Sequence, residues 1–306
     1  MLYYITKRLL YSLLTLFIIF TVIFILMHAI PGNVYSSDKA LPPEIENNIR
    51  VKYGLDKPIF QQYIKSLENT ATLDFGMSMK NEGREVNDII KEHFPKSAMV
   101  GVFSIFLCLI IGLPLGIFSG LNKGKWQDNA TMVLATIGVT VPSFVLGTLL
   151  QYFIGVKLGW LPTIGFNSFE NLILPSIALS LFPLSFIARL VRSGMVESLE
   201  QDYIRTARAK GLTERVVILK HALKNSILPV ITYLGPLAAG VLTGSFVIES
   251  IFNIPGLGRY FVDSISSRDY TVIMGVSVFY AMILILMNFI VDVVYVFVDP
   301  RIKYKN

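Results

Sequence analysis

The sequence predicts an all-α membrane protein with six transmembrane helices and with both termini in the cytoplasm. Three observations predict this fold: a low content of charged residues, six long uncharged runs, and an uneven distribution of Lys and Arg between alternate connecting segments. Of the 306 residues, 53% are hydrophobic and only 16% are charged, whereas about a quarter are charged in soluble domains.

The uncharged runs are long enough to cross a bilayer as helices. Each is close to or above the roughly 18 residues that a helix needs to span the hydrocarbon core. We therefore expect one transmembrane helix in each of these runs: residues 9–27, 97–121, 130–156, 171–188, 226–248 and 271–291. The single cysteine, Cys108, lies in the second run and is expected to be a small apolar core residue.

The orientation follows from the cations, because short cytoplasmic loops carry an excess of Lys and Arg. Basic residues collect before the first run, at 123–125, in the segment 189–224 with eight Lys or Arg, and after residue 300. The opposite short loops carry few, and the 66-residue segment 31–96 is balanced, with nine basic and ten acidic residues. This bias alone accounts for the net charge of +6, so nucleic-acid binding is not expected.

These runs divide the chain into four parts. Residues 1–30 form an N-terminal transmembrane helix, and residues 31–96 form an extracytoplasmic loop or cap. Residues 97–298 form a five-helix core that contains a basic segment at 198–225, and residues 299–306 form a cytoplasmic tail.

The predicted spans hold almost no charge. Buried carboxylates and cations in membranes usually mark ion coupling or proton relays, and only Asp292 lies in a span, near its cytoplasmic end. We expect Asp292 to pair with a neighbouring helix. Energy for any transport must then come from outside these helices.

Prolines and glycines interrupt the middle spans. Proline breaks the helical hydrogen-bond ladder, and glycines at four-residue spacing allow helices to approach closely. These residues indicate either tight packing or a moving core made of spans two to five. The prolines are Pro114, Pro142, Pro175, Pro183, Pro229 and Pro236, and the glycines are Gly112, Gly116, Gly120, Gly240 and Gly244.

The basic segment predicts two short helices joined by a pivot. Ser198 with Gln201 resembles a capping box, Gly211 suits a left-handed helix end, and Thr213 can cap a second helix that runs to about residue 225. On the first helix Tyr203, Thr206, Ala207 and Lys210 share one face by spacing. We expect this face to receive the surface of another protein, and Ala207 to lie exposed there.

The loop 31–96 also shows helical spacing. Apolar residues recur at helical intervals over 44–67, broken at Gly54 and Pro58, and again over 85–94. A flexible linker would lack such faces. We expect a small folded cap that seats another protein, or alternatively packing on the rim of this chain.

In combination, several segments resemble the permeases of ABC importers in the oligopeptide, dipeptide and nickel branch. The coupling segment of that branch is similar to "DYIRTARAKGL" followed by "HALKNSILPVI". Further similar segments are "YGLDKPIFQQYIKSL", "LDFGMSM", "VPSFVLGTLL", "LGWLPTIGF", "GSFVIESIFNIPGLGRYFVDSI" and "VDPRIKY". The chain departs from the general importer pattern of Glu-Ala-Ala, because it has Arg205-Thr206-Ala207, and Gly211 stands eighteen residues before Pro229.

The resemblance implies a prokaryotic inner-membrane, multi-pass permease subunit that is not itself an enzyme. It also implies a homologous second permease as a heterodimer partner, two cytoplasmic ATPase subunits that bind ATP and Mg, and an extracytoplasmic substrate-binding protein. No cofactor or metal is expected in this chain. The residues implied to couple to the ATPase are Asp202, Tyr203, Arg205, Thr206, Ala207, Lys210, Gly211 and Leu212.

The sequence does not match the phosphate loop of an ATPase. A phosphate loop requires Gly, four residues, then Gly-Lys-Ser/Thr, and "GLNKGKW" has the wrong gap and a Trp at the hydroxyl position. ATP hydrolysis is therefore expected on other chains.

The substrate and the class of protein have alternatives. Oligopeptides or dipeptides are the favoured substrates, and nickel or a metal chelate is the alternative substrate. A stand-alone carrier or membrane enzyme is the alternative from another class of protein.

Overall fold

The structure is a computed structural model that describes all residues except 1, 30–43, 45–46, 49–50, 52 and 299–306. In the described residues the secondary structure is helical apart from one isolated bridge between Met77 and Glu85. The predicted tail at 299–306 and much of the predicted loop after the first helix lie outside the described residues.

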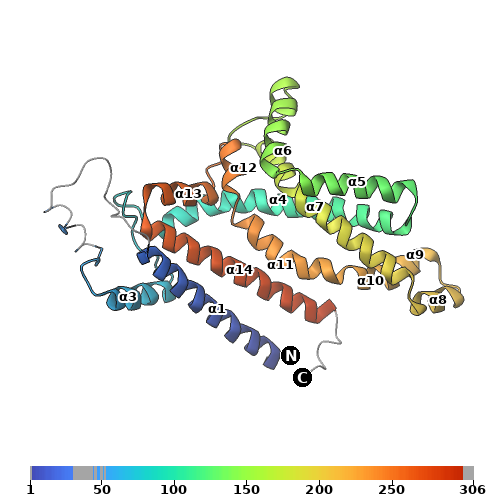
Figure 1. The fold of residues 1–306 in the computed structure, drawn as a ribbon, viewed down its shortest axis with the longest axis horizontal. Helices are drawn as coiled ribbons and strands as arrows, with labels where there is room; N and C mark the ends of the chain where they lie inside the picture. The colour runs from blue at the N-terminus through green and yellow to red at the C-terminus, as the bar shows by residue number, and fades with distance from the viewer. Residues whose placement is uncertain (1, 30–43, 45–46, 49–50, 52, 299–306) are drawn as a thin grey trace.

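Among the described residues, five helices are long and apolar enough to cross a membrane, and one bent pair raises the number to six if it counts as one span. In Figure 1 the long helices run alongside one another, and α4 packs mainly on α7, while α14 lies between α1 and α11. Their bounds are α1 Leu2–Ala29, α4 Val86–Leu121, α7 Glu170–Leu199, α11 Leu228–Leu242 and α14 Tyr270–Val298.

The third predicted span is not straight. It consists of α5 (Trp126–Thr140), α6 (Ser143–Leu150) and the π-helical turn η1 (Gln151–Lys157), and α5 meets the α6–η1 segment at 99°. The bend lies at Pro142, which stands directly before α6 in an extended conformation. The sequence thus predicted the position of the interruption at Pro142, but not the size of the bend.

Two helices extend well beyond their uncharged runs. Helix α4 begins at Val86, so the apolar pattern at 85–94 belongs to this helix, which continues through Pro95. Helix α7 continues through the charged residues after 188 and ends only at Leu199. The first charged residues mark where a helix leaves the lipid. They do not mark the end of the helix, because the backbone hydrogen bonds can continue in water.

The glycine spacing in α4 serves close packing on α7. A Cβ at Gly116 would lie 2.6 Å from the Ala188 carbonyl oxygen, and one at Gly120 would lie 2.6 Å from the Met195 Cβ. Gly240 in α11 has no such neighbour within 4 Å, and Gly244 follows α11 in a left-handed conformation with φ +89°. The expected close packing is therefore absent at Gly240 in the described residues, whereas Gly244 does approach α4, because a Cβ there would lie 3.0 Å from the Ser97 Cβ.

Three buried carboxylates, Asp128, Glu249 and Asp269, were not expected from the sequence, because each lies one or two residues outside an uncharged run. Asp128 is 2% exposed and is bound by Arg192 of α7, whose Nη2 donates to Oδ2 at 2.7 Å. Glu249 of α12 (Phe246–Ile251) is also 2% exposed and accepts hydrogen bonds from Ser97 Oγ and from the Arg259 backbone N–H, both at 2.7 Å. Glu249 thereby satisfies the N-terminus of α13 (Leu257–Ser267) from a distant part of the chain.

The predicted pairing of Asp292 is confirmed. Its Oδ2 lies 2.9 Å from Nη1 of Arg8, so the pair ties α14 to α1. Cys108 is fully buried in the core, as expected for a small apolar residue.

The helix predicted after Gly54 and Pro58 is α3 (Ile59–Ala71), with Gly54 at φ +69° and Pro58 directly before it. Helix α3 contacts α1: the Tyr63 ring packs edge-on against Phe24 at 5.2 Å between centroids, and its hydroxyl lies 2.8 Å from Thr21 Oγ1. This contact is the arrangement expected of packing on the rim of the chain.

Candidate functional site

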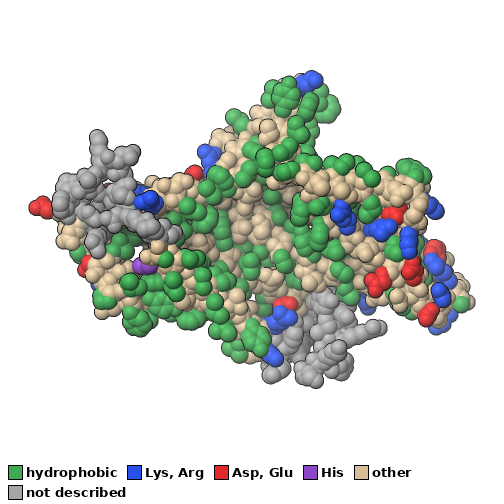
Figure 2. Space-filling view, viewed as in Figure 1, with side chains coloured by type: hydrophobic (Ala, Val, Ile, Leu, Met, Phe, Trp, Pro, Cys, Tyr) green, Lys and Arg blue, Asp and Glu red, His purple; other side chains and the backbone are tan. Residues whose placement is uncertain are grey.

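The segment between α7 and α11 folds into an elbow, which we define as residues 200–226. Its first arm is α8 (Asp202–Ala209), and its second arm is a continuous run of α9 (Glu214–Val216), the π-helical turn η2 (Val217–Ala222) and α10 (Leu223–Ser226). Figure 2 shows charged side chains gathered at this end of the molecule, whereas the surface over the long helices is largely hydrophobic.

The turn between the arms depends on Gly211. This residue has φ +77°, in the left-handed region that glycine enters at no steric cost. Its N–H donates to the Arg208 carbonyl at 2.9 Å, which ends α8. The predicted pivot at Gly211 is therefore confirmed.

An ion pair bridges the two arms. Arg208 donates from Nε and Nη2 to the Glu214 carboxylate at 3.1 and 2.6 Å. This bidentate contact holds the pKa of Glu214 below its usual range, because the Arg208 hydrogen bonds favour the ionised carboxylate. Both side chains are about half exposed, so the pair orients the arms more than it stabilises them.

The predicted start of the first arm was wrong. Ser198 lies inside the last turn of α7, and its hydroxyl accepts a hydrogen bond from Ser226 Oγ at 3.1 Å instead of capping α8. Helix α8 begins at Asp202. The residue before it, Gln201, makes no cap hydrogen bond with its side chain. The hydroxyl pair instead joins α7 to the end of the second arm.

The inner face of α8 consists of Ile204 and Ala207, which are 0% and 5% exposed. They belong to a core cluster that also holds Val217 and Ala222 of the second arm and Met195 of α7. The expectation that Ala207 lies on an exposed face was therefore wrong. Helical spacing groups residues on a face, but it does not say whether that face meets the chain itself or a partner.

The outer surface of the elbow combines cations with apolar side chains. Of the residues expected to couple to a partner, all except Ala207 are exposed: Asp202, Tyr203, Arg205, Thr206, Lys210, Gly211 and Leu212. Two further apolar residues, Val216 and Leu219, are 39% and 52% exposed on the second arm. These two residues were not among the predicted coupling residues, although apolar side chains beside basic residues are a usable sign of a contact surface.

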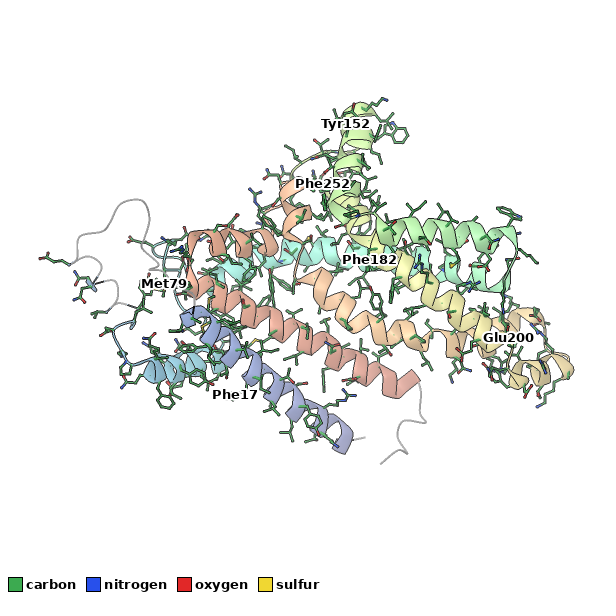
Figure 3. All side chains as sticks on the ribbon, in the orientation of Figure 1. Phe17, Met79, Tyr152, Phe182, Glu200 and Phe252 are labelled. Carbon is green, nitrogen blue, oxygen red and sulfur yellow. The ribbon has the colours of Figure 1, made fainter. Side chains whose placement is uncertain are left out.

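The elbow is tied to the transmembrane helices at several points. Glu200 accepts from Lys123 Nζ at 2.6 Å, which links the elbow to the turn after α4 (Glu200 is labelled in Figure 3). Asn225 Nδ2 donates to the Tyr203 hydroxyl at 2.8 Å and joins the two arms. The core cluster continues from Ile204 through Met195 to Cys108 within α4. A displacement of the elbow would therefore be transmitted to α7 and α4 through packed side chains.

The chain matches two family models. Residues 112–304 match the binding-protein-dependent transport system inner membrane component, and residues 1–100 match the N-terminal region of such membrane components. Together the two models cover the membrane helices and the elbow.

Similar proteins span nearly the whole chain. The dipeptide transport system permease protein DppB of Bacillus subtilis is 46% identical, over 98% of this chain and 97% of that protein. The oligopeptide transport system permease protein OppB of Haemophilus influenzae is 42% identical, over 99% of this chain and 100% of that protein.

A solved structure shares the fold. A chain of the MetNI methionine ABC transporter in inward-facing conformations superimposes with a TM-score of 0.57 at 20% identity, over 69% of this chain and 96% of that chain. The long helices, the full-length similarity and the family match agree, and the chain belongs to the family of binding-protein-dependent transport system inner membrane components.

Proposed function

We propose that this chain is a permease subunit of an ATP-driven importer of dipeptides or oligopeptides. The observation that carries the proposal is the 42–46% identity over almost the full length to permeases named for dipeptide and oligopeptide transport. The chain forms half of the translocation pathway and performs no catalytic step. A homologous second permease forms the other half.

The proposed topology has six spans, with both termini and the elbow in the cytoplasm. The bent α5–α6 pair counts as one span in this topology. The basic residues of the elbow and of the chain ends support this orientation, because cytoplasmic segments are enriched in Lys and Arg.

The exposed outer surface of the elbow is the proposed docking site for a separate ATPase subunit, which binds ATP and Mg. Tyr203, Leu212, Val216 and Leu219 offer apolar contact area, and Arg205 and Lys210 offer charge. An external binding protein delivers the substrate on the opposite side. The burial of Ile204 and Ala207 under this surface supports coupling, because both belong to the same core cluster as Met195 of α7.

Uptake by the reconstituted complex tests the proposal. The chain is purified with its co-purifying subunits, placed in proteoliposomes and supplied with labelled dipeptides, labelled oligopeptides or radioactive nickel. Peptide uptake that needs ATP on the elbow side is the expected result. Uptake of nickel alone, or peptide uptake by the chain without an ATPase subunit, would overturn it.

A further inference from the structure

Helix α3 presents an apolar surface that the chain leaves uncovered. Phe60 is 72% exposed and Ile64 is 37% exposed, and both follow one stripe of the helix at four-residue spacing. Tyr63 and Leu67, next to this stripe, are only partly exposed. Only part of the apolar face of α3 therefore contacts the rest of the chain.

The position of α3 is set by its contact with α1. The Tyr63 ring packs on Phe20 and Phe24, at 5.7 and 5.2 Å between centroids, and its hydroxyl meets Thr21. Thr21 lies eight residues before the end of α1 at Ala29, which corresponds to about 12 Å along the helix axis. Helix α3 thus lies beside the last part of a membrane-spanning helix rather than beyond it.

The surface of α1 around this contact is itself apolar and exposed. Phe17, Val22 and Ile25 are 47–58% exposed, as expected for side chains in contact with lipid. Figure 2 shows hydrophobic side chains along α1 and on toward α3. The uncovered side chains Phe60 and Ile64 are continuous with this lipid-facing surface.

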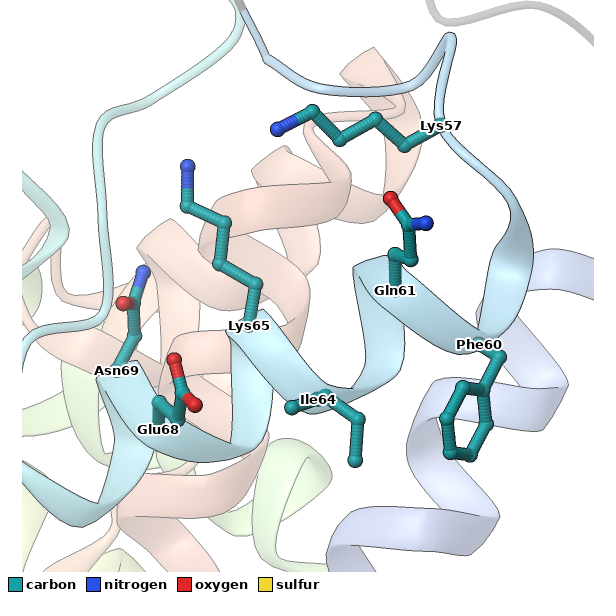
Figure 4. A pocket seen from close by; sticks show the side chains of 7 residues that line it. All are labelled: Lys57, Phe60, Gln61, Ile64, Lys65, Glu68 and Asn69. Atoms are coloured by element: carbon teal, nitrogen blue, oxygen red, sulfur yellow. The ribbon is translucent and has the colours of Figure 1, made fainter.

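Cations lie beside the apolar stripe. Figure 4 shows Phe60 and Ile64 pointing one way, whereas Lys57, Lys65 and Gln61 point the other way. These residues, with Glu68 and Asn69, surround a shallow hollow of about 530 Å³. Lysine carries an apolar stem and a charged end, so it can cover acyl chains while its ammonium reaches a phosphate at the bilayer surface.

We propose that α3 is an interfacial helix that binds phospholipid at the membrane surface nearest Ala29. Acyl chains cover Phe60 and Ile64, and Lys57 and Lys65 contact the lipid phosphates. Such a helix lies in the headgroup region with its apolar face toward the hydrocarbon. This contact anchors the segment after α1 to the membrane, and it rests on the position of α3 rather than on the identity of the transported substrate.

Spin-label accessibility tests the proposal directly. Single cysteines replace Phe60, Ile64 or Gln61 in a Cys108→Ala background, in the full chain purified with its co-purifying subunits. The labelled protein is reconstituted in vesicles of phosphatidylethanolamine and phosphatidylglycerol. Collisions are then measured with oxygen, which concentrates in lipid, and with a water-soluble nickel chelate.

Labels at Phe60→Cys and Ile64→Cys should show an oxygen-to-nickel collision ratio several-fold higher than the label at Gln61→Cys, which serves as the matched control on the polar side. Equal ratios at all three positions would show that water covers the stripe and would overturn the proposal. Low collision rates with both reagents at 60 and 64 would show that a protein covers it, and would overturn it as well.

Discussion

Ala207 illustrates how a small residue can be part of a core although its neighbours on the helix are exposed. It is 5% exposed and lies with Ile204, Val217 and Ala222 under the elbow. Thr206 is exposed next to it. A substitution at Ala207 therefore tests the folding of the elbow, and a substitution at Thr206 tests the docking of a partner.

Ala207→Glu is predicted to destabilise the elbow. A glutamate at this position would overfill the core and bury a charge, and we expect a cost of about 1–3 kcal/mol or more. Thermal unfolding of the purified protein, with limited proteolysis at the elbow, measures the effect. Thr206→Glu is the matched control and should leave both unchanged. Equal melting temperatures for the two variants would contradict the burial of Ala207.

Asp128 is a buried carboxylate whose hydrogen bonds join three parts of the chain. Its carboxylate accepts from Ser119 Oγ at 2.5 Å and from the Gly124 N–H at 3.0 Å, in addition to the two hydrogen bonds from Arg192. Asp128→Asn would leave the Arg192 guanidinium, whose side chain is only 29% exposed, without its counter-charge.

We predict that Asp128→Asn lowers the free energy of unfolding by about 2–4 kcal/mol, since removal of one partner leaves an uncompensated, partly buried charge. The melting temperature in detergent measures this loss. Glu200→Gln removes the exposed partner of Lys123 and should give no measurable change, because exposed pairs are screened by water. A similar decrease in melting temperature for both variants would show that burial does not determine how much each ion pair stabilises the protein.

At the scale of elements, the contact between α4 and α7 depends on glycine. A Cβ added at Gly116 would lie 2.6 Å from both the Ala188 carbonyl oxygen and the Val191 Cβ. Neither neighbour is the free end of a flexible side chain, so the helices must separate to admit a methyl group.

Gly116→Ala is therefore predicted to cost about 1–3 kcal/mol through overpacking. Gly240→Ala is the matched control: it lies in helix α11 with open space around it, and alanine there is expected to add roughly 0.5–1 kcal/mol of helix stability. Opposite shifts of the melting temperature are the expected result for the purified chain. A Gly116→Ala variant as stable as Gly240→Ala would contradict the close approach of α4 and α7.

At the scale of the whole molecule, the elements that depend on local sequence were predictable. The long apolar runs predict helices because lipid demands a continuous apolar surface, and Gly211 predicts the elbow turn because few other residues adopt its conformation. The 99° bend at Pro142 was not predictable, because its angle depends on how the rest of the bundle packs.

Contacts between distant residues account for the other differences. The pairing of Asp128 with Arg192 and the hydrogen bond from Ser97 to Glu249 join parts of the chain that lie far apart in sequence. Burial of Ala207 likewise depends on α7 and on the second arm of the elbow. A pattern within one helix contains no information on which other helix covers it.

Crosslinking from the elbow tests the central claim most directly. Leu219, 52% exposed on the second arm, is replaced by cysteine in a Cys108→Ala background and fitted with a short photoactivatable crosslinker in the assembled complex. Phe60→Cys on α3, 72% exposed, is the matched control at the proposed outer side. The account predicts a crosslink from position 219 to the ATPase subunit and none from position 60. Crosslinking of position 219 to the external binding protein, or of position 60 to the ATPase, would contradict it.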